Sequence, residues 1–192
     1  MSDQKEILRR YLEAGFEALR WKIDGLDDYH VRRPLVPTGT NLLGLAKHLS
    51  YVTAGYFGPV FDRVSEVPLD PGDEPNADMW ATAEESRAEI LARLDAAAAE
   101  AMATIDSLDL DAPGRVSWWG DHGAVTLHQI LVHMIAELHR HVGHADIIRE
   151  LIDGAAGVRP GSTNLPGDSE GADAAWWVAH HAQVQATADR FR

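Results

Sequence analysis

The feature that most constrains the fold is a helical pattern over residues 126–153, because one face of that helix mixes apolar and ionisable side chains. Residues three or four positions apart lie on the same side of a helix. The ionisable residues on this side are His133, Glu137, His141 and His144. Apolar residues flank them, Ile130 and Met134 before and Ala145 and Ile148 after. A face with apolar ends is expected to be buried. An unsatisfied buried polar group costs about 2–7 kcal/mol, and a bound metal ion would satisfy this set.

The other patterns predict a mostly helical chain with one domain over residues 1–192. No stretch alternates apolar and polar residues over the length of a strand. Further helices are expected over residues 3–24, 40–58, 82–107 and 172–192, and loops over 25–37, 62–79, 108–125 and 154–171. The expected helix caps are Ser2 or Asp3, Thr38 or Thr40, a capping box at Thr82, Thr126, and Gly154 after the central helix. The predicted fold class is all-α, a four-helix bundle with an additional C-terminal helix.

Composition argues against several classes of function. The formal net charge is −13, and such a surface repels phosphate backbones and anionic lipids, so neither nucleic acid nor a membrane is an expected partner. The absence of cysteine removes disulfides, thiolate metal ligands and a cysteine nucleophile. The N-terminus lacks the apolar segment of a signal peptide, and no run of about 18 apolar residues occurs. The expected location is the cytoplasm.

His48 lies on the apolar side of the second expected helix, among leucines and a valine. One interpretation is a core histidine bonded to a backbone carbonyl or a carboxylate. The other is a metal ligand, because metal sites in helical bundles are built from side chains on facing helices. Glu137 and His141, four residues apart, would then bind the same ion from one helix face. Three protein ligands leave one coordination position open, which is typical of catalytic zinc sites. Nickel, iron, cobalt and manganese stay open as alternatives.

Each of the remaining candidates also has a structural alternative. Glu137 and His141 alone would make an exposed helix pair worth about 0.2–0.5 kcal/mol. His133 and His144 are either groups that orient a metal ligand or histidines on the helix surface. His122, close to Trp119 in a loop, is a candidate for the mouth of a pocket. The paired tryptophans at 118–119 and 176–177 are either parts of the core or platforms for a substrate.

Two segments carry a resemblance to a known family. Residues 41–49 (NLLGLAKHL) and 133–154 (HMIAELHRHVGHADIIRELIDG) resemble the signature segments of the DinB/YfiT-like superfamily. More narrowly they are similar to its DUF664 branch, which is related to mycothiol-dependent maleylpyruvate isomerase and mycothiol S-transferases. The similarity extends from the first helix to Gly154 and is weakest after it.

The resemblance implies a four-helix bundle that holds a divalent metal through His48, Glu137 and His141. Many superfamily members have histidine at the position of Glu137, and the glutamate resembles the mycothiol-using branch. His144 stands where many members have glutamine, which implies a role in the pocket and not on the metal. Trp119 and His122 are the residues expected to contact the thiol cofactor.

A chain without cysteine that uses a sulfur nucleophile must take it from outside. A free thiol has a pKa near 8.5, and a coordinating metal deprotonates it. The expected function is therefore a thiol S-transferase or isomerase, in which a metal-bound thiolate such as that of mycothiol attacks a small electrophile. One alternative is a metal-dependent hydrolase that activates water, with His144 or His133 as the base. Another is a stress protein that binds a metal or ligand without turnover. The sequence leaves the oligomeric state open, a homodimer included.

Overall fold

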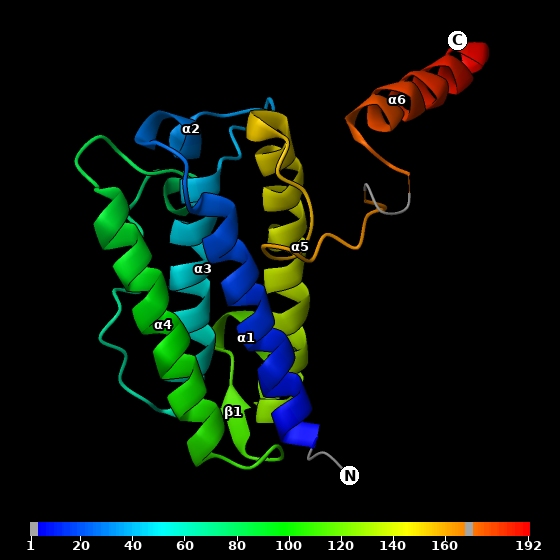
Figure 1. Cartoon of the computed structure of the whole chain (residues 1–192). Coiled ribbons are helices and arrows are strands. Elements are labelled where there is room, and N and C mark those ends of the chain that lie inside the picture. Colours follow the sequence, from blue (N-terminus) through cyan, green and yellow to red (C-terminus); the bar gives the residue numbers. More distant parts are fainter. Residues whose placement is uncertain (1–3, 168–170) are drawn as a thin grey trace.

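The computed structural model describes residues 4–167 and 171–192. Four long helices lie side by side and form a bundle (Figure 1): α1 Gln4–Ile23, α3 Leu42–Phe57, α4 Arg87–Ser107 and α5 Leu127–Asp153. A further helix, α6 Ala174–Ala188, projects away from this bundle. The predicted all-α fold, a four-helix bundle with an additional C-terminal helix, is confirmed. None of the described helices is long and apolar enough to span a lipid bilayer.

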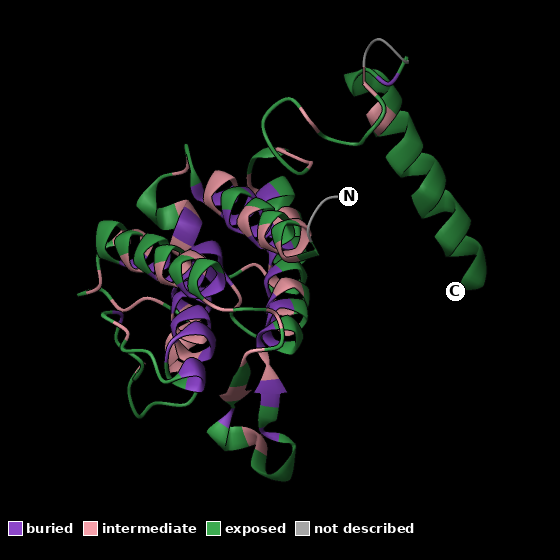
Figure 2. Cartoon of the chain, turned by 90° about the horizontal axis from the view of Figure 1, so that it is seen from below, coloured by how far each residue is buried: buried purple, intermediate pink, exposed green. Residues whose placement is uncertain are grey.

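The core lies between the inward faces of the four bundle helices (Figure 2). Helix α3 packs mainly against α4, and α1 packs mainly against α5. Aliphatic side chains with no solvent exposure form the centre of the core: Leu12, Leu19, Leu45, Leu49, Ile90, Leu131 and Leu138. Helix α3 is buried along most of its length. It is therefore the central element of the bundle, and its face toward α5 lies within the protein.

The helix ends follow capping chemistry, partly at residues other than those expected. Thr126 caps α5 as predicted, and Gly154 ends it in the left-handed conformation with φ of 79°. Asn41, and not Thr38 or Thr40, caps α3 by accepting from the backbone N–H of Gly44. Ser86 opens α4 in a complete capping box with Glu89. The expected caps Ser2 and Asp3 lie outside the described residues.

The capping box predicted at Thr82 is wrong, although Glu85 stands at the right spacing. The Glu85 carboxylate does accept from the backbone N–H of Thr82 at 3.0 Å. It also binds the buried ammonium group of Lys47 at 2.7 Å. Glu85 therefore holds the chain before α4 against α3, and the helix begins later, at Arg87.

Several short elements lie inside segments predicted to be loops. Helix α2 Asp28–Arg32 lies within residues 25–37. Strands β1 Pro113–Arg115 and β2 Ala124–Thr126 pair antiparallel within and next to residues 108–125, with Gly114 opposite Val125. Among the described residues, the 3-10 turns η2 Ala77–Met79 and η3 Ser117–His122 also lie inside expected loops. Two others do not: η1 Pro59–Phe61 follows the second expected helix directly, and η5 Asp189–Phe191 lies within the last expected helix. Elements of three to six residues span too little chain for a periodic pattern to reveal them.

Candidate metal centre

Three side chains meet where α3 faces α5. Helix α3 supplies His48, and α5 supplies Glu137 and His141. The ligand atoms that these residues offer all lie within 4.8 Å of one another. The Glu137 Oε1 atom lies 3.1 Å from Nε2 of His141 and 3.4 Å from Nε2 of His48. All three side chains are largely shielded from solvent, with exposed fractions of 12–28%. The structure thus brings together the three residues predicted as metal ligands.

The local sequence explains why α5 presents two of these groups together. Glu137 and His141 are four residues apart, so they lie one above the other on the same face of the helix. Met134 and Ala145, at the two ends of the stripe, have no solvent exposure. These apolar residues hold that face of α5 inside the bundle, and the ionisable groups between them are drawn inward as well.

The electrostatics of the centre favour the protonation states of metal ligands. Burial raises the pKa of Glu137, but hydrogen bonds and charge from His48 and His141 outweigh it and leave the pKa below its ordinary value. Burial, and then the neighbouring His48, lower the pKa of His141 against the opposing effect of Glu137. Metal ligands must be an ionised carboxylate and a neutral imidazole. Both shifts run in that direction.

Asp78, which belongs to no pattern in the sequence, completes the environment of His48. Its Oδ2 atom lies 2.6 Å from Nδ1 of His48, so the imidazole can donate its Nδ1–H to the carboxylate. The Nε2 atom of His48 is then left to face Glu137 and His141. A carboxylate that holds the second ring nitrogen is the usual partner of a metal-binding histidine. Asp78 belongs to η2, 30 residues after His48 in the chain, and no periodic pattern relates the two.

A glycine on α3 allows η2 to approach His48. A Cβ atom added at Gly44 would overlap the backbone carbonyl oxygen of Met79. The side chain of Asn41 also donates to this carbonyl, at 3.4 Å. Gly44 and Asn41 are therefore the signals in the sequence that a loop packs closely here, although they do not say which loop.

The other predicted site residues divide into neighbours of the centre and residues apart from it. His144 is exposed, and its Nδ1 atom lies 3.3 Å from Nδ1 of His141. His133 packs its ring against Tyr56, with centroids 4.8 Å apart, and against Trp119 at 5.0 Å. His122 ends η3 and is exposed. His144 therefore contacts a metal ligand directly, and His133 lines the same cavity as Glu137.

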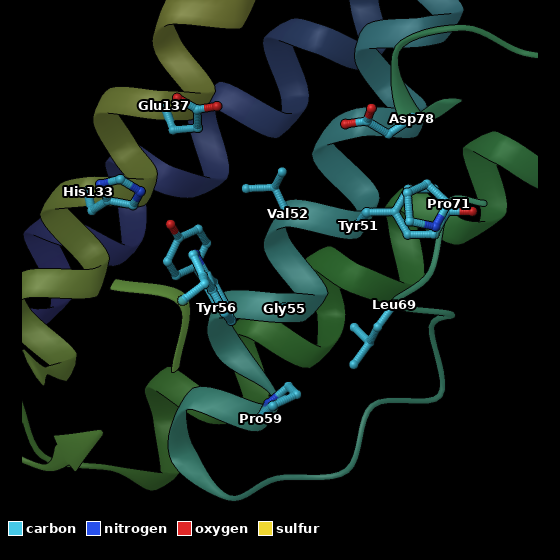
Figure 3. A pocket seen from close by; sticks show the side chains of 11 residues that line it. Tyr51, Val52, Gly55, Tyr56, Pro59, Leu69, Pro71, Asp78, His133 and Glu137 are labelled. Atoms are coloured by element: carbon cyan, nitrogen blue, oxygen red, sulfur yellow. The ribbon is translucent and has the colours of Figure 1, made fainter. Parts of the chain in front are cut away.

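A cavity of about 540 Å³ opens beside the centre, between α3, the loop over residues 62–79, η3 and α5 (Figure 3). Asp78, Glu137 and His133 lie on its wall toward the centre. Most of the remaining wall is apolar or aromatic: Tyr51, Val52, Gly55, Tyr56, Pro59, Leu69, Pro71 and Trp118. Ligand pockets of enzymes have this size and this mixture of apolar walls with a few polar groups.

The core interpretation holds for Trp119, which is partly buried and packs against the core, but not for every tryptophan. Trp118 is 57% exposed and lines the cavity, whereas Trp119 is half-buried and contacts His133. Trp176 is 40% exposed, on a helix with no buried residue among those described. A core position is therefore wrong for Trp118 and Trp176.

Comparison with known proteins identifies a family and a solved structure of similar fold. The family model described as mycothiol-S-transferase matches residues 7–154. The fold is similar to that in a crystal structure titled as the conserved protein of locus from Enterococcus faecalis, with 15% sequence identity and a TM-score of 0.63. That similarity covers 81% of this chain and 100% of the other. No curated protein matches the chain. The matched residues include the whole centre and end before α6.

Proposed function

This chain belongs to the mycothiol-S-transferase family, which is DinB/YfiT-like, and we propose that it joins an external thiol such as mycothiol to a small electrophile, as an S-transferase or isomerase. The observation that carries the proposal is the group of His48, Glu137 and His141 beside an apolar cavity. The chain has no cysteine of its own to act as the nucleophile.

The donor set fits a divalent metal ion, and we propose zinc. Two imidazoles and one carboxylate are ligands that zinc accepts, and three protein ligands leave a position for a substrate. Nickel, iron, cobalt and manganese accept the same donors. When bound, the ion would supply the positive charge that holds a thiol as its thiolate.

Residues around the ligands hold them in the required state. Asp78 accepts the Nδ1–H of His48, which keeps the Nε2 lone pair of that ring directed at the centre. His144 is placed to accept the Nδ1–H of His141 in the same way, at 3.3 Å. We therefore assign His144 the role of positioning His141. The negative charge of Glu137 completes the ligand set.

In this proposal the cavity holds the electrophile, and a side chain on its wall accepts the proton of the thiol. His133 lies on the cavity wall with Glu137, and we assign it as the group that accepts the proton released by the thiol. A bond then forms between the sulfur and the electrophilic carbon. In a substitution the leaving group departs with its electron pair. In an isomerisation the sulfur–carbon bond breaks again, the electron pair stays on sulfur, and the proton held by His133 returns to it as the thiol is released. The apolar walls keep water from competing with the thiol.

The test uses the metal as its own reporter. Protein loaded with Co²⁺ is titrated with mycothiol, and a sulfur ligand is expected to add an intense near-ultraviolet charge-transfer band. Glu137→Gln should weaken or abolish this band, because the centre loses a negative ligand. His133→Ala should keep the band and slow thiol transfer. Ester or amide turnover in thiol-free buffer, with no band on adding thiol, would contradict the proposal and favour a hydrolase.

A further inference from the structure

The cavity is lined by aromatic and proline side chains that suit a flat ring. The ring of Tyr56 meets that of Trp118 edge to face, with centroids 5.3 Å apart. Pro59 and Pro71 also line the cavity and have little conformational freedom. Aromatic pairs favour edge-to-face and offset contacts with a further ring. A rigid aromatic wall of this kind binds a planar ligand with little loss of side-chain entropy.

The fixed charges that the protein's own side chains place on the cavity wall are carboxylates. Among the described residues that line it, none is lysine or arginine, and two are carboxylates, Asp78 and Glu137. A ligand carboxylate would need an arginine or lysine to pair with. When a thiol holds the open position of the metal, a ligand carboxylate finds no such partner on the wall, and it would lose hydration close to the carboxylate of Asp78, which is costly in an apolar site.

Arg93 contacts the cavity-lining Tyr51, and Lys47 shares the partner Glu85 with it; both cations are engaged with other groups. The Arg93 guanidinium donates to the Tyr51 hydroxyl at 2.7 Å and lies over the Tyr51 ring, 5.2 Å from its centroid. Lys47 is buried and pairs with Glu85 at 2.7 Å. Glu85 also lies 3.9 Å from Arg93. Both cations are therefore paired within the protein, and neither lines the cavity.

Two phenol groups on the cavity wall, Tyr51 and Tyr56, can instead donate hydrogen bonds to an uncharged ligand. Because the Tyr51 oxygen accepts from Arg93, the Tyr51 hydroxyl hydrogen is directed elsewhere, toward an acceptor. Burial raises the pKa of Tyr51 above its ordinary value, so this phenol stays protonated. In Figure 3 the Tyr56 hydroxyl points toward the part of the cavity where His133 and Glu137 lie. Both phenols suit a carbonyl, amide or nitro oxygen of an uncharged ligand.

We propose that this cavity binds uncharged electrophiles with an aromatic ring and excludes those that carry a carboxylate. That these ligands are substrates rests on the proposed function. That the cavity binds neutral ligands more tightly than charged ones is a statement about binding alone. This charge selection restricts the substrate class to neutral aryl electrophiles such as activated aryl halides.

The test compares two ligands that differ in one charge. Binding of 3-nitrobenzamide and 3-nitrobenzoate, which do not react, is measured by calorimetry on the zinc-loaded full chain saturated with mycothiol. Saturation keeps the thiol, and not the benzoate, at the metal. The amide is expected to bind at least ten times more tightly. In turnover, 4-chloro-3-nitrobenzamide is expected to exceed 4-chloro-3-nitrobenzoate by a similar factor in kcat/KM, after division by the uncatalysed rates with the same thiol.

A cation placed in the cavity should reverse the preference. Val52→Arg puts a guanidinium on the wall, with Val52→Met as a control of similar length and no charge. Val52→Met should still prefer the amide, and Val52→Arg should prefer the benzoate. Leu69→Arg, at a position that is 46% exposed and tolerant of substitution, repeats the test if Val52→Arg fails to fold.

The outcomes separate this inference from the proposed function. Equal binding of the two ligands to the wild-type chain, or binding of neither, would overturn the charge selection. An arginine variant that folds and still prefers the amide would also overturn it. Selective binding of the amide without thiol transfer to any electrophile would support the selection and contradict the proposed function.

Discussion

At the scale of single residues, the centre depends on hydrogen bonds that hold each imidazole in one orientation. Asp78 provides this support for His48, and His144 provides it for His141. Neither contact adds a ligand to the metal. Each reduces the freedom of a ring that would otherwise lose rotamer entropy on binding an ion. The contribution of such partners is therefore measurable as metal affinity.

We predict that Asp78→Asn weakens zinc binding by about 10- to 100-fold, the usual effect of losing the carboxylate partner of a metal-binding histidine. The asparagine is neutral and can present either its oxygen or its amide to the imidazole, so the ring is less well fixed. Competition with a chromophoric chelator measures the affinity. Asp73→Asn, an exposed residue of the same loop, is the matched control and should bind zinc like the wild type.

A second prediction concerns pH. Burial and the adjacent His48 lower the pKa of His141, so in metal-free protein its ring should titrate below the ordinary value of 6.5. Between the lowered pKa of the folded chain and 6.5, the unfolded chain binds a proton at this residue that the folded chain does not. The free energy of unfolding should therefore fall as the pH decreases through this window.

NMR of the imidazole nitrogens measures the titration, and urea unfolding at several pH values measures the stability. His141→Asn should lose less stability than the wild type over the same window, because the titrating group is gone. A titration midpoint of His141 above 6.5 would contradict the argument.

At the scale of elements, the packing of η2 on α3 decides where Asp78 lies. A glycine at position 44 leaves room for the Met79 carbonyl, and Asn41 both caps α3 and donates to that carbonyl. The loop is thus fixed by contacts at the first turn of α3, one turn before His48. A change at this contact acts on the centre through the position of the loop.

We predict that Gly44→Ala destabilises the protein by about 1–3 kcal/mol, the usual cost of overpacking, and weakens zinc binding because Asp78 moves away from His48. Gly55→Ala on the same helix is the control, since a Cβ there meets no atom within 4 Å. Relief of glycine in a helix interior should make Gly55→Ala neutral or more stable by about 0.5–1 kcal/mol. If urea unfolding shows equal effects for the two variants, the close contact with η2 is not the cause.

At the scale of the whole molecule, the bundle and α6 contribute differently to stability. The described residues of α6 include none that is buried. The segment that follows α5, in contrast, is joined to the bundle, because the buried ammonium of Lys22 donates to the Gly157 carbonyl at 2.6 Å and pairs with Asp146 at 2.9 Å. The net charge of −13 is also a property of the whole molecule. From it we still predict that the protein does not bind nucleic acid.

We predict that a chain ending at Asp173 unfolds within about 2 °C of the full chain and binds zinc equally, because a helix without buried surface contributes little hydrophobic stabilisation. A chain ending at Gly154 loses the Lys22–Gly157 contact as well and should unfold at a lower temperature. Differential scanning calorimetry distinguishes the two. A large loss on removing residues 174–192 alone would show that α6 packs against the bundle in solution.

The sequence by itself determined the helical class and the inward stripe on α5. It also determined the three candidate metal ligands, Glu137 and His141 on that stripe and His48 on α3. These features depend on the helical period, which the backbone sets locally, and on the burial of apolar residues that share a face. The resemblance of residues 41–49 and 133–154 to the DinB/YfiT-like superfamily also came from the sequence, and the family is confirmed.

Only the tertiary structure decided which loop reaches His48, which tryptophan lines the cavity and which residues cap α3 and α4. Asp78 lies 30 residues from His48 and Trp118 lies 62 residues from Tyr56, so no local period relates the members of either pair. Thr82 matched the capping pattern as well as Ser86 did, and the choice between them came from Lys47, a buried cation on another helix that takes the Glu85 carboxylate. Such contacts depend on how distant segments pack against each other. The free energy of that packing depends on all of these segments together, so no single stretch of the sequence predicts it.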